Sequence, residues 1–494
     1  MTITAEDSER NLVLAAEDFS LADFKALHRF SKNDERVISK LMAHGPVLLQ
    51  GSRGSGKSAL MREAADRLAL TAEVPALAIY LSLRHMPLLR SVGDEYQRIL
   101  CELLIERIRR VLGSSEIIFD AAPTLASVQS GLTDLAQSLG RRLVIMFDDA
   151  AHLGREASLA DFFDVFRTLS NSAISCKATI YPGVTNFGNR FDVYNDATVV
   201  DVIRDEDQAG FADLFTEVIT ARYPDLASRR FGSDLALKDV ASFVGKSVLG
   251  NMRGFLFACN ALSLSDAETI GLTELGKCFL ELTTNFYWPL IDEVKPKLGK
   301  YVPIVDSSKE VAEILLRECG RPQSTSVIVH RDIVARLAKA FEILEYAGFI
   351  SKRESSKAMK SGGRGSRYAI NLCMLLEHIS GARLTQDVYN KLNRNLGEPV
   401  QLHSKGLVLG NISLPPVSEN QEPEILNDPI ETLRKSLMYP YGLTDNMIES
   451  LQNGGYLTIR DASGATDQQL DELKGIGGAK VLRIRNVIGQ AVWM

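Results

Sequence analysis

The sequence predicts an α/β fold, in which a parallel β-sheet is covered by helices on both faces and is followed by helical and mixed segments. Three observations support this prediction. Short apolar runs alternate with amphipathic stretches between residues 46 and 202, a pattern typical of parallel sheets that are buried on both faces. A glycine-rich loop joins the first run to the next helical pattern. Residues 207–290 then show helical patterns and no convincing strand.

The composition is that of an ordinary globular protein. The 494 residues are 45% hydrophobic and 24% charged, and at about 150 residues per domain this length predicts about three domains. The net charge is −6, from 62 acidic and 56 basic residues, so any surface that binds nucleic acid must be local. The six cysteines include no CxxC pair, which argues against a disulfide scaffold or a zinc ribbon. We expect a cytoplasmic protein with reduced cysteines, no signal peptide and no membrane span.

The predicted strands and helices alternate along the first part of the chain. The apolar runs cover residues 47–50, 76–82, 143–148, 178–184 and 198–202. Helical patterns lie between them at residues 59–70, 96–112, 125–139 and 159–170. We expect residues 1–24 to form a lead-in, residues 25–205 the sheet domain and residues 206–299 a helical domain.

The strongest motif lies between the first run and the first helical pattern. Residues 51–58 fit G-x-x-x-x-G-K-[ST] at every fixed position. Glycines let the backbone turn tightly and direct successive N–H groups at phosphate oxygens, and the following helix presents its positive end to the anion. Lys57 is expected on the β- and γ-phosphates and Ser58 on Mg²⁺. The residues expected to hold ATP are Gly51, Ser52, Arg53, Gly54, Ser55, Gly56, Lys57, Ser58 and Ala59.

The second half of such a site is predicted at the end of another strand. Apolar residues at 143–147 run directly into Asp148 and Asp149. Asp148 is expected to hold Mg²⁺, directly or through water, and Asp149 to orient and polarise the attacking water. Aspartate at the second position has a shorter reach than the commoner glutamate, which bears on the hydrolysis rate more than on nucleotide binding.

With these two motifs the chain resembles the AAA+ ATPases, in particular the initiator-like branch related to the origin-recognition ATPases, and the neighbouring STAND NTPases. The resemblance covers roughly residues 25–290. It implies that Thr185 or Asn186 contacts the γ-phosphate or water as sensor 1. It also implies that Arg253, in the GNMR motif that begins at Gly250, reaches the γ-phosphate from a helical lid as sensor 2.

The same resemblance implies an arginine finger, which stabilises charge on the phosphate that is being transferred. Arg190 is the candidate, with Arg155 and Arg167 as alternatives. A finger that acts on the neighbouring subunit's nucleotide requires a homo-oligomer. A surface arginine, solvated or salt-bridged, is the alternative interpretation. His152, close behind the acid pair, is interpreted as structural.

Residues 300–394 resemble a winged helix. A helical pattern at 334–344 precedes Gly348, Phe349 and Ile350, and a glycine-rich basic loop follows. The loop carries Lys352, Arg353, Lys357, Lys360, Arg364 and Arg367. Basic residues on such a loop suit contact with DNA phosphates, and Lys360, Arg364 and Arg367 are the candidates. A solvated loop or a wing that docks on protein is the alternative.

Residues 431–494 are predicted to form an all-α domain after a linker at 395–430, with a short strand pair at 400–414 as the alternative for part of that linker. Two amphipathic segments flank the turn from Gly475 to Gly478, which resembles a helix-hairpin-helix motif. The resemblance implies a tandem domain that grips duplex or branched DNA through its backbone, and the exposed amides of such a turn suit phosphate. The candidate DNA contacts are Lys474, Gly475, Gly477, Lys480 and Arg483. A protein-interaction module of the same fold is the alternative.

These motifs predict an ATPase that uses ATP and Mg²⁺ and couples nucleotide state to DNA binding. One alternative is a STAND-like, nucleotide-gated scaffold that recruits protein partners or an effector nuclease. A DNA-binding adaptor with structural ATP is another. The resemblance also suggests a phage-defence or mobile-element setting. No nuclease motif is identified in the chain.

Overall fold

The computed structural model describes residues 16, 19–69, 74–83, 93–113, 117–151, 156–183, 187–188, 190–232, 235–360, 362–404, 406, 408–417, 424–436, 439 and 442–493. Its central feature is a parallel five-stranded sheet with the strand order β2-β3-β4-β1-β5. The strands are β1 (Val47–Gln50), β2 (Ala76–Ser82), β3 (Arg142–Ala151), β4 (Ile174–Ile180) and β5 (Thr198–Asp201). This sheet confirms the predicted α/β fold of a P-loop NTPase.

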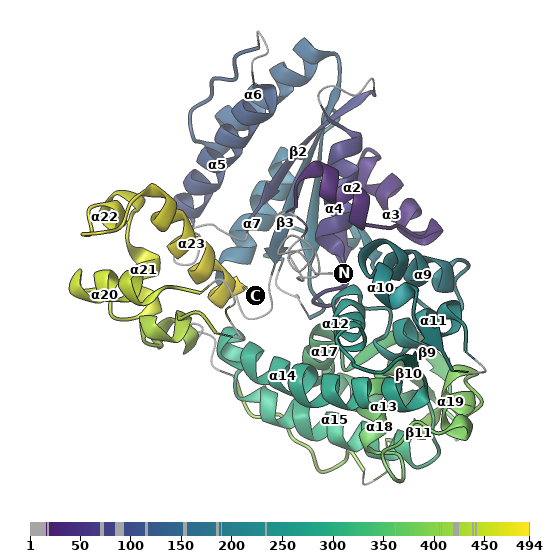
Figure 1. Ribbon diagram of the computed structural model, residues 1–494. Helices are drawn as coiled ribbons and strands as arrows, with labels where there is room; N and C mark the ends of the chain where they lie inside the picture. Colours follow the sequence, from purple (N-terminus) through teal and green to yellow (C-terminus); the bar gives the residue numbers. More distant parts are fainter. Residues whose placement is uncertain are drawn as a thin grey trace.

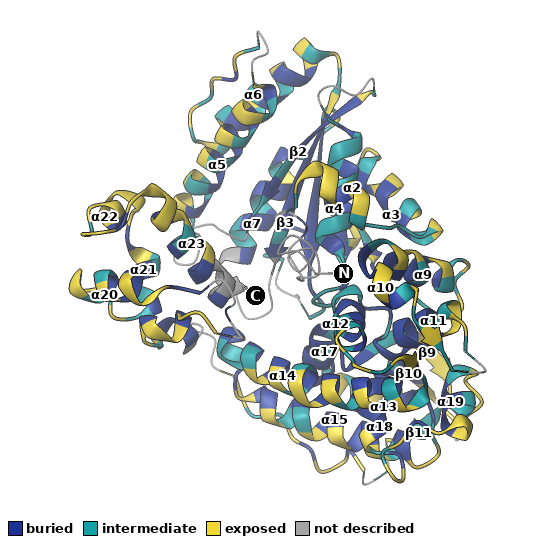
Figure 2. Ribbon diagram, viewed as in Figure 1, coloured by how far each residue is buried: buried dark blue, intermediate teal, exposed yellow. Residues whose placement is uncertain are grey.

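Helices cover both faces of this sheet (Figure 1). They are α2 (Leu21–Leu27), α3 (Lys32–Met42), α4 (Lys57–Arg67), α5 (Asp94–Leu112), α6 (Leu125–Leu139), α7 (Glu156–Leu169) and α8 (Val193–Asp196). Successive side chains of a strand point to opposite faces, and each face has its own core. Leu48 and Ile145 belong to one cluster, whereas Leu49 and Val144 belong to the other. The inner strands are therefore buried on both sides, whereas the edge strand β5 is largely exposed (Figure 2).

Strand β4 begins four residues before the predicted run at 178–184. The polar residues Ser175 and Lys177 interrupt its apolar pattern, yet both are fully buried. The Lys177 amine donates to the carbonyl oxygens of Ala43, at 2.7 Å, and Gly45. These bonds satisfy backbone groups at the end of α3, so a charged residue is tolerated in the interior.

A helical region follows the sheet, as predicted, with one short parallel strand pair inside it. Its helices are α9 (Phe211–Arg222), α10 (Pro224–Ala227), α11 (Leu237–Ser247), α12 (Met252–Ser263), α13 (Leu272–Leu282) and α14 (Trp288–Val294). The short turns are η2 (Thr283–Tyr287), η3 (Lys295–Lys297) and η4 (Gly299–Tyr301), and the strand pair is β6 (Arg230–Phe231) with β7 (Thr269–Ile270).

The next part of the chain builds a four-stranded sheet with the order β11-β8-β10-β9. Its elements are α15 (Ile304–Gly320), β8 (Ser326–His330), α16 (Arg331–Arg336), α17 (Ala338–Ala347), β9 (Ile350–Ala358), β10 (Arg364–Ile370), α18 (Leu372–Glu377), α19 (Gln386–Asn393) and β11 (Val400–Leu402). Strands β9 and β10 form an antiparallel hairpin. Strand β11, from the segment interpreted as a linker, pairs in parallel with β8. That segment also places Leu409 and Ile412 in the main core, which differs from an unstructured linker.

The last described segment, 424–493, has a hydrophobic core of its own. Its elements are η5 (Glu424–Asn427), η6 (Ile430–Leu433), α20 (Asp445–Asn453), α21 (Ile459–Gly464), α22 (Asp467–Asp471) and α23 (Gly478–Trp493). Ile425 and Leu426 already belong to this core, so folded structure starts before residue 431. Figure 1 shows this unit, in yellow, to one side of the sheet and of α14.

All six cysteines are free and buried. Within the described part of the chain, no helix has the length and hydrophobicity that crossing a bilayer requires.

Candidate nucleotide-binding site

The glycine-rich loop connects the end of β1 to the start of α4, where the motif requires it. Gly54 and Gly56 have φ values of 80° and 91°, which only glycine adopts without strain. A Cβ atom at Gly54 would also lie 2.5 Å from the Cβ atom of Arg253. The loop is therefore a tight backbone cradle at the N-terminal end of a helix, the arrangement that suits phosphate.

Lys57 lies at the centre of this cradle and is only 5% exposed. Its amine donates to the carbonyl oxygens of Gly51, at 2.8 Å, and Ser52, at 3.1 Å. Burial lowers the pKa of Lys57 to about 7, although the carboxylates of Asp149 and Asp148 act in the opposite direction. Arg253 lowers this pKa further. The two carboxylates and the Arg253 guanidinium therefore all lie close enough to Lys57 to affect its charge.

Asp148 is fully buried at the end of β3 and is held by three donors. Its Oδ1 accepts from Thr179 Oγ1 at 2.9 Å and from the Asp149 backbone N–H at 3.0 Å. Its Oδ2 accepts from the Tyr80 hydroxyl at 2.6 Å. Donors on both carboxylate oxygens fix the side chain and favour its ionised form, which is the form that binds a cation.

Asp149 has a left-handed backbone, with a φ of 52°. The pairing of β3 with β4 is irregular between Phe147 and Ala151. The Asp149 N–H also donates to Thr179 Oγ1 at 2.7 Å, and Asp149 Oδ1 accepts from the Tyr181 hydroxyl at 3.3 Å. Aspartate tolerates this conformation better than most residues. The two carboxylates therefore have different partners, whereas Thr179 Oγ1 contacts both residues of the acid pair.

The lid motif lies directly on the phosphate loop. Asn251 caps α12 by accepting from the Gly254 N–H at 3.1 Å, and its amide donates to the Arg53 carbonyl at 2.7 Å. The Arg253 N–H donates to the Gly54 carbonyl at 3.1 Å. The start of α12 therefore contacts the loop through backbone and side chain, and Arg253 is placed beside Lys57.

A buried ion pair supports the loop from the other side. Arg204, just after β5, pairs with Asp34 of α3 at 2.9 Å and donates to the Ser55 carbonyl at 2.5 Å. The Ser55 hydroxyl is buried and has no hydrogen-bond partner. An orphaned hydroxyl in this loop fits a site that takes a further polar ligand.

The loop also contacts α14 and α17. Arg53 pairs with Glu293 of α14 at 3.2 Å, and its N–H donates to the Tyr346 carbonyl of α17 at 3.1 Å. Burial and the Glu293 carboxylate have opposite effects on the Arg53 guanidinium, and its pKa is raised overall. Two elements far along the chain are therefore tied to the phosphate loop.

Sequence reasoning did not identify several of these residues. Tyr80, Thr179, Tyr181 and Arg204 all lie at or just beyond the carboxyl ends of parallel strands. Ligand sites of open α/β sheets form at that edge, so polarity at strand ends was the signal available in the sequence. Tyr346 carried no such signal, because it acts through tertiary packing alone.

The residues present fit a nucleotide with Mg²⁺. Among the described residues, no cluster of three or more His, Cys, Asp or Glu side chains is arranged to hold a metal. Mg²⁺ commonly takes one or two protein oxygens and completes its shell with water and substrate phosphates. Asp148, with Ser58 at the start of α4, matches that mode of binding.

The structure does not bring the remaining predicted residues of the ATPase core to this site within the part of the chain that it describes. Asn186, Thr185, Arg155 and His152 lie outside the described residues. Arg190 is on the surface, with its side chain 70% exposed, and pairs with Asp164 at 3.7 Å. Arg167 donates to the Arg190 carbonyl and pairs with Asp196. Both arginines therefore have their partners on α7, α8 and the segment between β4 and β5.

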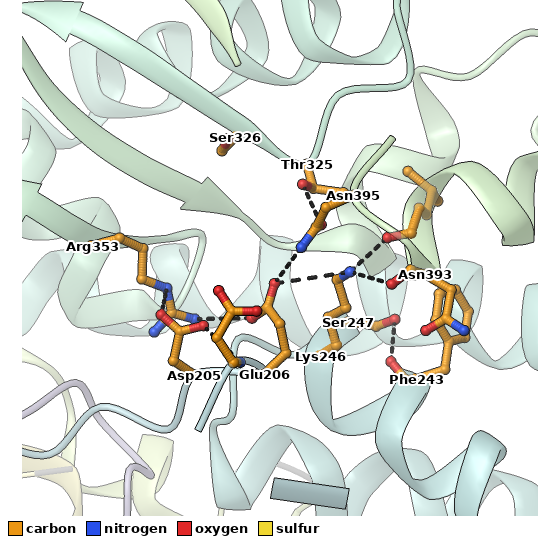
Figure 3. Close-up of polar contacts among 12 residues, drawn as sticks. Asp205, Glu206, Phe243, Lys246, Ser247, Thr325, Ser326, Arg353, Asn393 and Asn395 are labelled. Atoms are coloured by element: carbon orange, nitrogen blue, oxygen red, sulfur yellow. Dashed lines mark hydrogen bonds and ion pairs between the residues drawn. The ribbon is translucent and has the colours of Figure 1, made fainter. Parts of the chain in front are cut away.

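The basic loop of the predicted wing is largely paired within the chain. Arg353 contacts Asp205 and Glu206 in a buried cluster that also holds Lys246 and Asn395 (Figure 3). Lys357 and Arg367 both pair with Glu354, Lys360 pairs with Glu398, and Arg364 donates to Ser356. Most of the basic side chains predicted to contact DNA phosphates in this part of the chain therefore already have partners within the chain.

The predicted hairpin of the C-terminal unit lies between α22 and α23. Lys474, Gly475, Gly477 and Lys480 are exposed, whereas Ile476 is buried in the core of the unit. The Lys480 amine donates to the Gly475 carbonyl at 2.5 Å. Arg483 is partly buried and donates to the Gly442 carbonyl at 2.8 Å. The turn therefore presents the backbone and two lysines to solvent, while Arg483 contacts the preceding segment.

Comparisons with known proteins match only solved structures. No family model matches the chain and no curated protein is similar to it. It is similar to the Walker-type ATPase paby2304 of Pyrococcus abyssi, with 16% identity, coverage of 71% of this chain and 96% of that chain, and a TM-score of 0.43. It is also similar to Cdc6p from Pyrobaculum aerophilum, with 12% identity, 79% and 99% coverage, and a TM-score of 0.33. The Aeropyrum pernix ORC1 protein, solved in complex with DNA, has 15% identity, 70% and 91% coverage, and a TM-score of 0.30.

Proposed function

We propose that this protein is an ATPase that binds ATP with Mg²⁺, hydrolyses it, and couples its nucleotide state to DNA binding. One observation carries the proposal: the phosphate loop, the acid pair and the start of α12 meet at one place, where the Arg253 N–H bonds to Gly54 and the Tyr181 side chain contacts both Lys57 and Asp149. A cation in a backbone cradle opposite two carboxylates suits a polyphosphate and its metal.

Each residue has a role that follows from its place. The backbone of Gly51–Ser58 and the Lys57 amine hold the phosphate oxygens. Asp148 and Ser58 hold Mg²⁺, which when bound neutralises charge on the phosphates. Asp149, whose carboxylate has other partners than that of Asp148, orients the attacking water and accepts its proton. Arg253 binds the γ-phosphate from the lid.

The experiment that tests this proposal separates binding from hydrolysis. We expect Lys57→Ala to abolish ATP binding, and Asp149→Asn to keep binding within about threefold while phosphate release falls at least about a hundredfold. Lys238→Ala, at an exposed lysine that pairs with Asp213, is the matched control. Equal turnover by the wild type and Asp149→Asn would reject hydrolysis by this site.

For DNA binding, the exposed turn of the C-terminal unit supports the proposal better than the wing does. Lys474 and Lys480 flank backbone amides at the start of α23, where phosphate binds favourably. We expect the double variant Lys474→Ala/Lys480→Ala to weaken duplex binding. The slope of the logarithm of the binding constant against the logarithm of the salt concentration should become shallower by about two. Lys309→Ala/Lys391→Ala, on other helices, is the control. Unchanged affinity of the test variant would favour protein recruitment.

A second candidate function is the nucleotide-gated scaffold that recruits a protein partner or an effector nuclease. The paired state of the wing favours it, because Arg353, Arg367 and Lys360 all have acidic partners within the chain. Helix α17, which precedes the wing, likewise has no exposed residue with which to contact DNA. Slow turnover without any DNA effect on the ATPase rate would support this second function.

A further inference from the structure

The Lys57 amine has no N–H directed to open space. An ammonium group has three donors. Two bond to the carbonyl oxygens of Gly51 and Ser52, and the nitrogen lies 3.8 Å from the ring centroid of Tyr181. A cation over a ring face is attracted to it. A phosphate oxygen that binds this amine must therefore replace at least one of these three partners.

The Tyr181 hydroxyl contacts the other half of the site. It donates to Asp149 Oδ1 at 3.3 Å, and the whole residue is only 7% exposed. One side chain therefore covers the group that binds phosphate and also holds the carboxylate that orients water. Of the three partners of the Lys57 amine, only the Tyr181 ring is a side chain and can leave without remodelling the loop backbone.

Helix α17 holds the Tyr181 ring in this position. The rings of Tyr181 and Tyr346 meet edge to face, with centroids 5.0 Å apart at an angle of 64°. The Tyr346 carbonyl accepts from the Arg53 N–H, and Lys339 at the start of α17 donates to the Gly183 carbonyl at 2.9 Å. A movement of the Tyr181 ring thus changes contacts that fasten α17 to the phosphate loop and to the residues after β4.

We propose that Tyr181 is a positioning residue that occludes the phosphate-binding face of Lys57 and is displaced by the triphosphate, and that its displacement loosens α17. The proposal rests on the proposed nucleotide site and adds a gate to it. The ring is the occluding group, and the hydroxyl sets the position of Asp149 in the closed state.

The test separates the ring from the hydroxyl in the full-length chain. Association of a fluorescent N-methylanthraniloyl-ATP is measured by stopped flow for the wild type, Tyr181→Phe, Tyr181→Ala and the control Tyr194→Ala, at a tyrosine that is 91% exposed. We expect Tyr181→Ala to associate about tenfold faster, whereas Tyr181→Phe, which keeps the ring, stays within about twofold of the wild type. Tyr194→Ala should leave the rate unchanged.

Hydrogen exchange provides the second measurement. In the wild type, ATP should increase amide exchange across 338–347, and in Tyr181→Ala exchange there should be fast before ATP is added. Tyr346→Ala removes the support from the other side, and we expect it to speed association in the same way without altering residue 181. Equal association rates for Tyr181→Ala and the wild type, or slower binding by Tyr181→Ala, would overturn the proposal.

The outcome also distinguishes this gate from the site itself. Loss of binding in Tyr181→Ala/Lys57→Ala, together with fast binding in Tyr181→Ala, supports both. If Tyr181→Ala binds the nucleotide no faster than the wild type, the gate is contradicted but the proposed nucleotide site is not. Absence of nucleotide binding in every variant contradicts the proposed function and with it the gate.

Discussion

At the scale of residues, one hydroxyl links the two acids of the site. Thr179 Oγ1 donates to Asp148 and accepts from the Asp149 N–H. It therefore fixes the Asp148 carboxylate and also stabilises the left-handed backbone of Asp149. A single hydroxyl behind the acid pair can in this way set the geometry of both acidic residues.

Replacement of this hydroxyl tests its role. Thr179→Val keeps the volume of a fully buried side chain but removes both bonds. We expect turnover to fall about 10–100-fold and the Mg²⁺ requirement to rise, with ATP affinity changed by less than about threefold. Phosphate release measured against Mg²⁺ concentration checks this. The control is Thr216→Val, whose hydroxyl bonds only to the Ala212 carbonyl of its own helix; a fall in turnover of equal size there would contradict the assignment.

His28 makes the stability of the chain depend on pH. Its ring stacks on Phe24, with centroids 4.1 Å apart. Burial, and then the charge of Arg222, lower the pKa of His28 to about 4. Its value in an unfolded chain is about 6.5. Between these values the unfolded chain binds more protons than the folded one, so the free energy of unfolding falls as pH falls from about 6.5 to 4.

We therefore expect His28 to lower the free energy of unfolding by about 2 kcal/mol as the pH falls from about 6.5 to 4. His28→Gln stays neutral throughout and should remove that part of the pH dependence. Urea titrations at pH 7, 5.5 and 4.5 measure it. His403→Gln, at the histidine just after β11, is the comparison. An identical pH dependence in the wild type and His28→Gln would contradict the effect.

At the scale of elements, α14 and α17 tie later parts of the chain to the phosphate loop. Glu293 accepts from Arg53 at 3.2 Å and from Lys297 at 2.9 Å. Burial opposes ionisation of this carboxyl, but the two cations prevail and keep the pKa of Glu293 below its ordinary value. Both cations are themselves nearly inaccessible, with side chains 9% and 7% exposed. Removal of the carboxylate would leave two buried charges without their common partner.

We accordingly expect Glu293→Gln to lower the free energy of unfolding by about 2–3 kcal/mol, because breaking a buried pair costs more than the pair itself contributes. Equilibrium unfolding in urea measures the change. Glu310→Gln, at an exposed position on α15, should change stability by less than about 0.5 kcal/mol. Equal effects of the two changes would show that the Glu293 pair does not hold α14 in place.

The sequence was sufficient for elements with a clean pattern. The runs at 47–50 and 76–82 and the helix at 125–139 occur with the predicted bounds. Strand β4 was misplaced because Lys177 breaks its apolar pattern and finds its partners, Ala43 and Gly45, far away in sequence. The phosphate loop and acid pair are local motifs, whereas Tyr181 and Tyr346 meet only after folding. Local sequence patterns therefore predict the chemistry of the site, whereas tertiary contacts determine which side chains lie over it.

At the scale of the whole molecule, one face of the five-stranded sheet, the helical region after it and the four-stranded sheet share one core. Residues from Leu48 to Ile412 belong to the same hydrophobic cluster. The cluster around Arg353 reinforces this unity, because it joins the segment after β5, helix α11 and strand β9 (Figure 3). We therefore expect a structural change at the phosphate loop to be transmitted to β9 and α17.

The C-terminal unit differs because its core is separate from that of the main body. We expect a cavity in this core to affect DNA binding without affecting ATP binding. Ile484 is fully buried there, and Ile484→Ala should destabilise the unit by about 2–4 kcal/mol. Hydrogen exchange should then increase across 442–493 but not across 47–67, while ATP affinity in the full-length chain stays within about twofold. Leu482→Ala, at a side chain that is 62% exposed on the same helix, should change neither measurement. If Ile484→Ala weakened ATP binding as much as duplex binding, the two parts would be one energetic unit, and DNA contact at the C-terminal turn would be coupled to the nucleotide site through stability rather than through the lid.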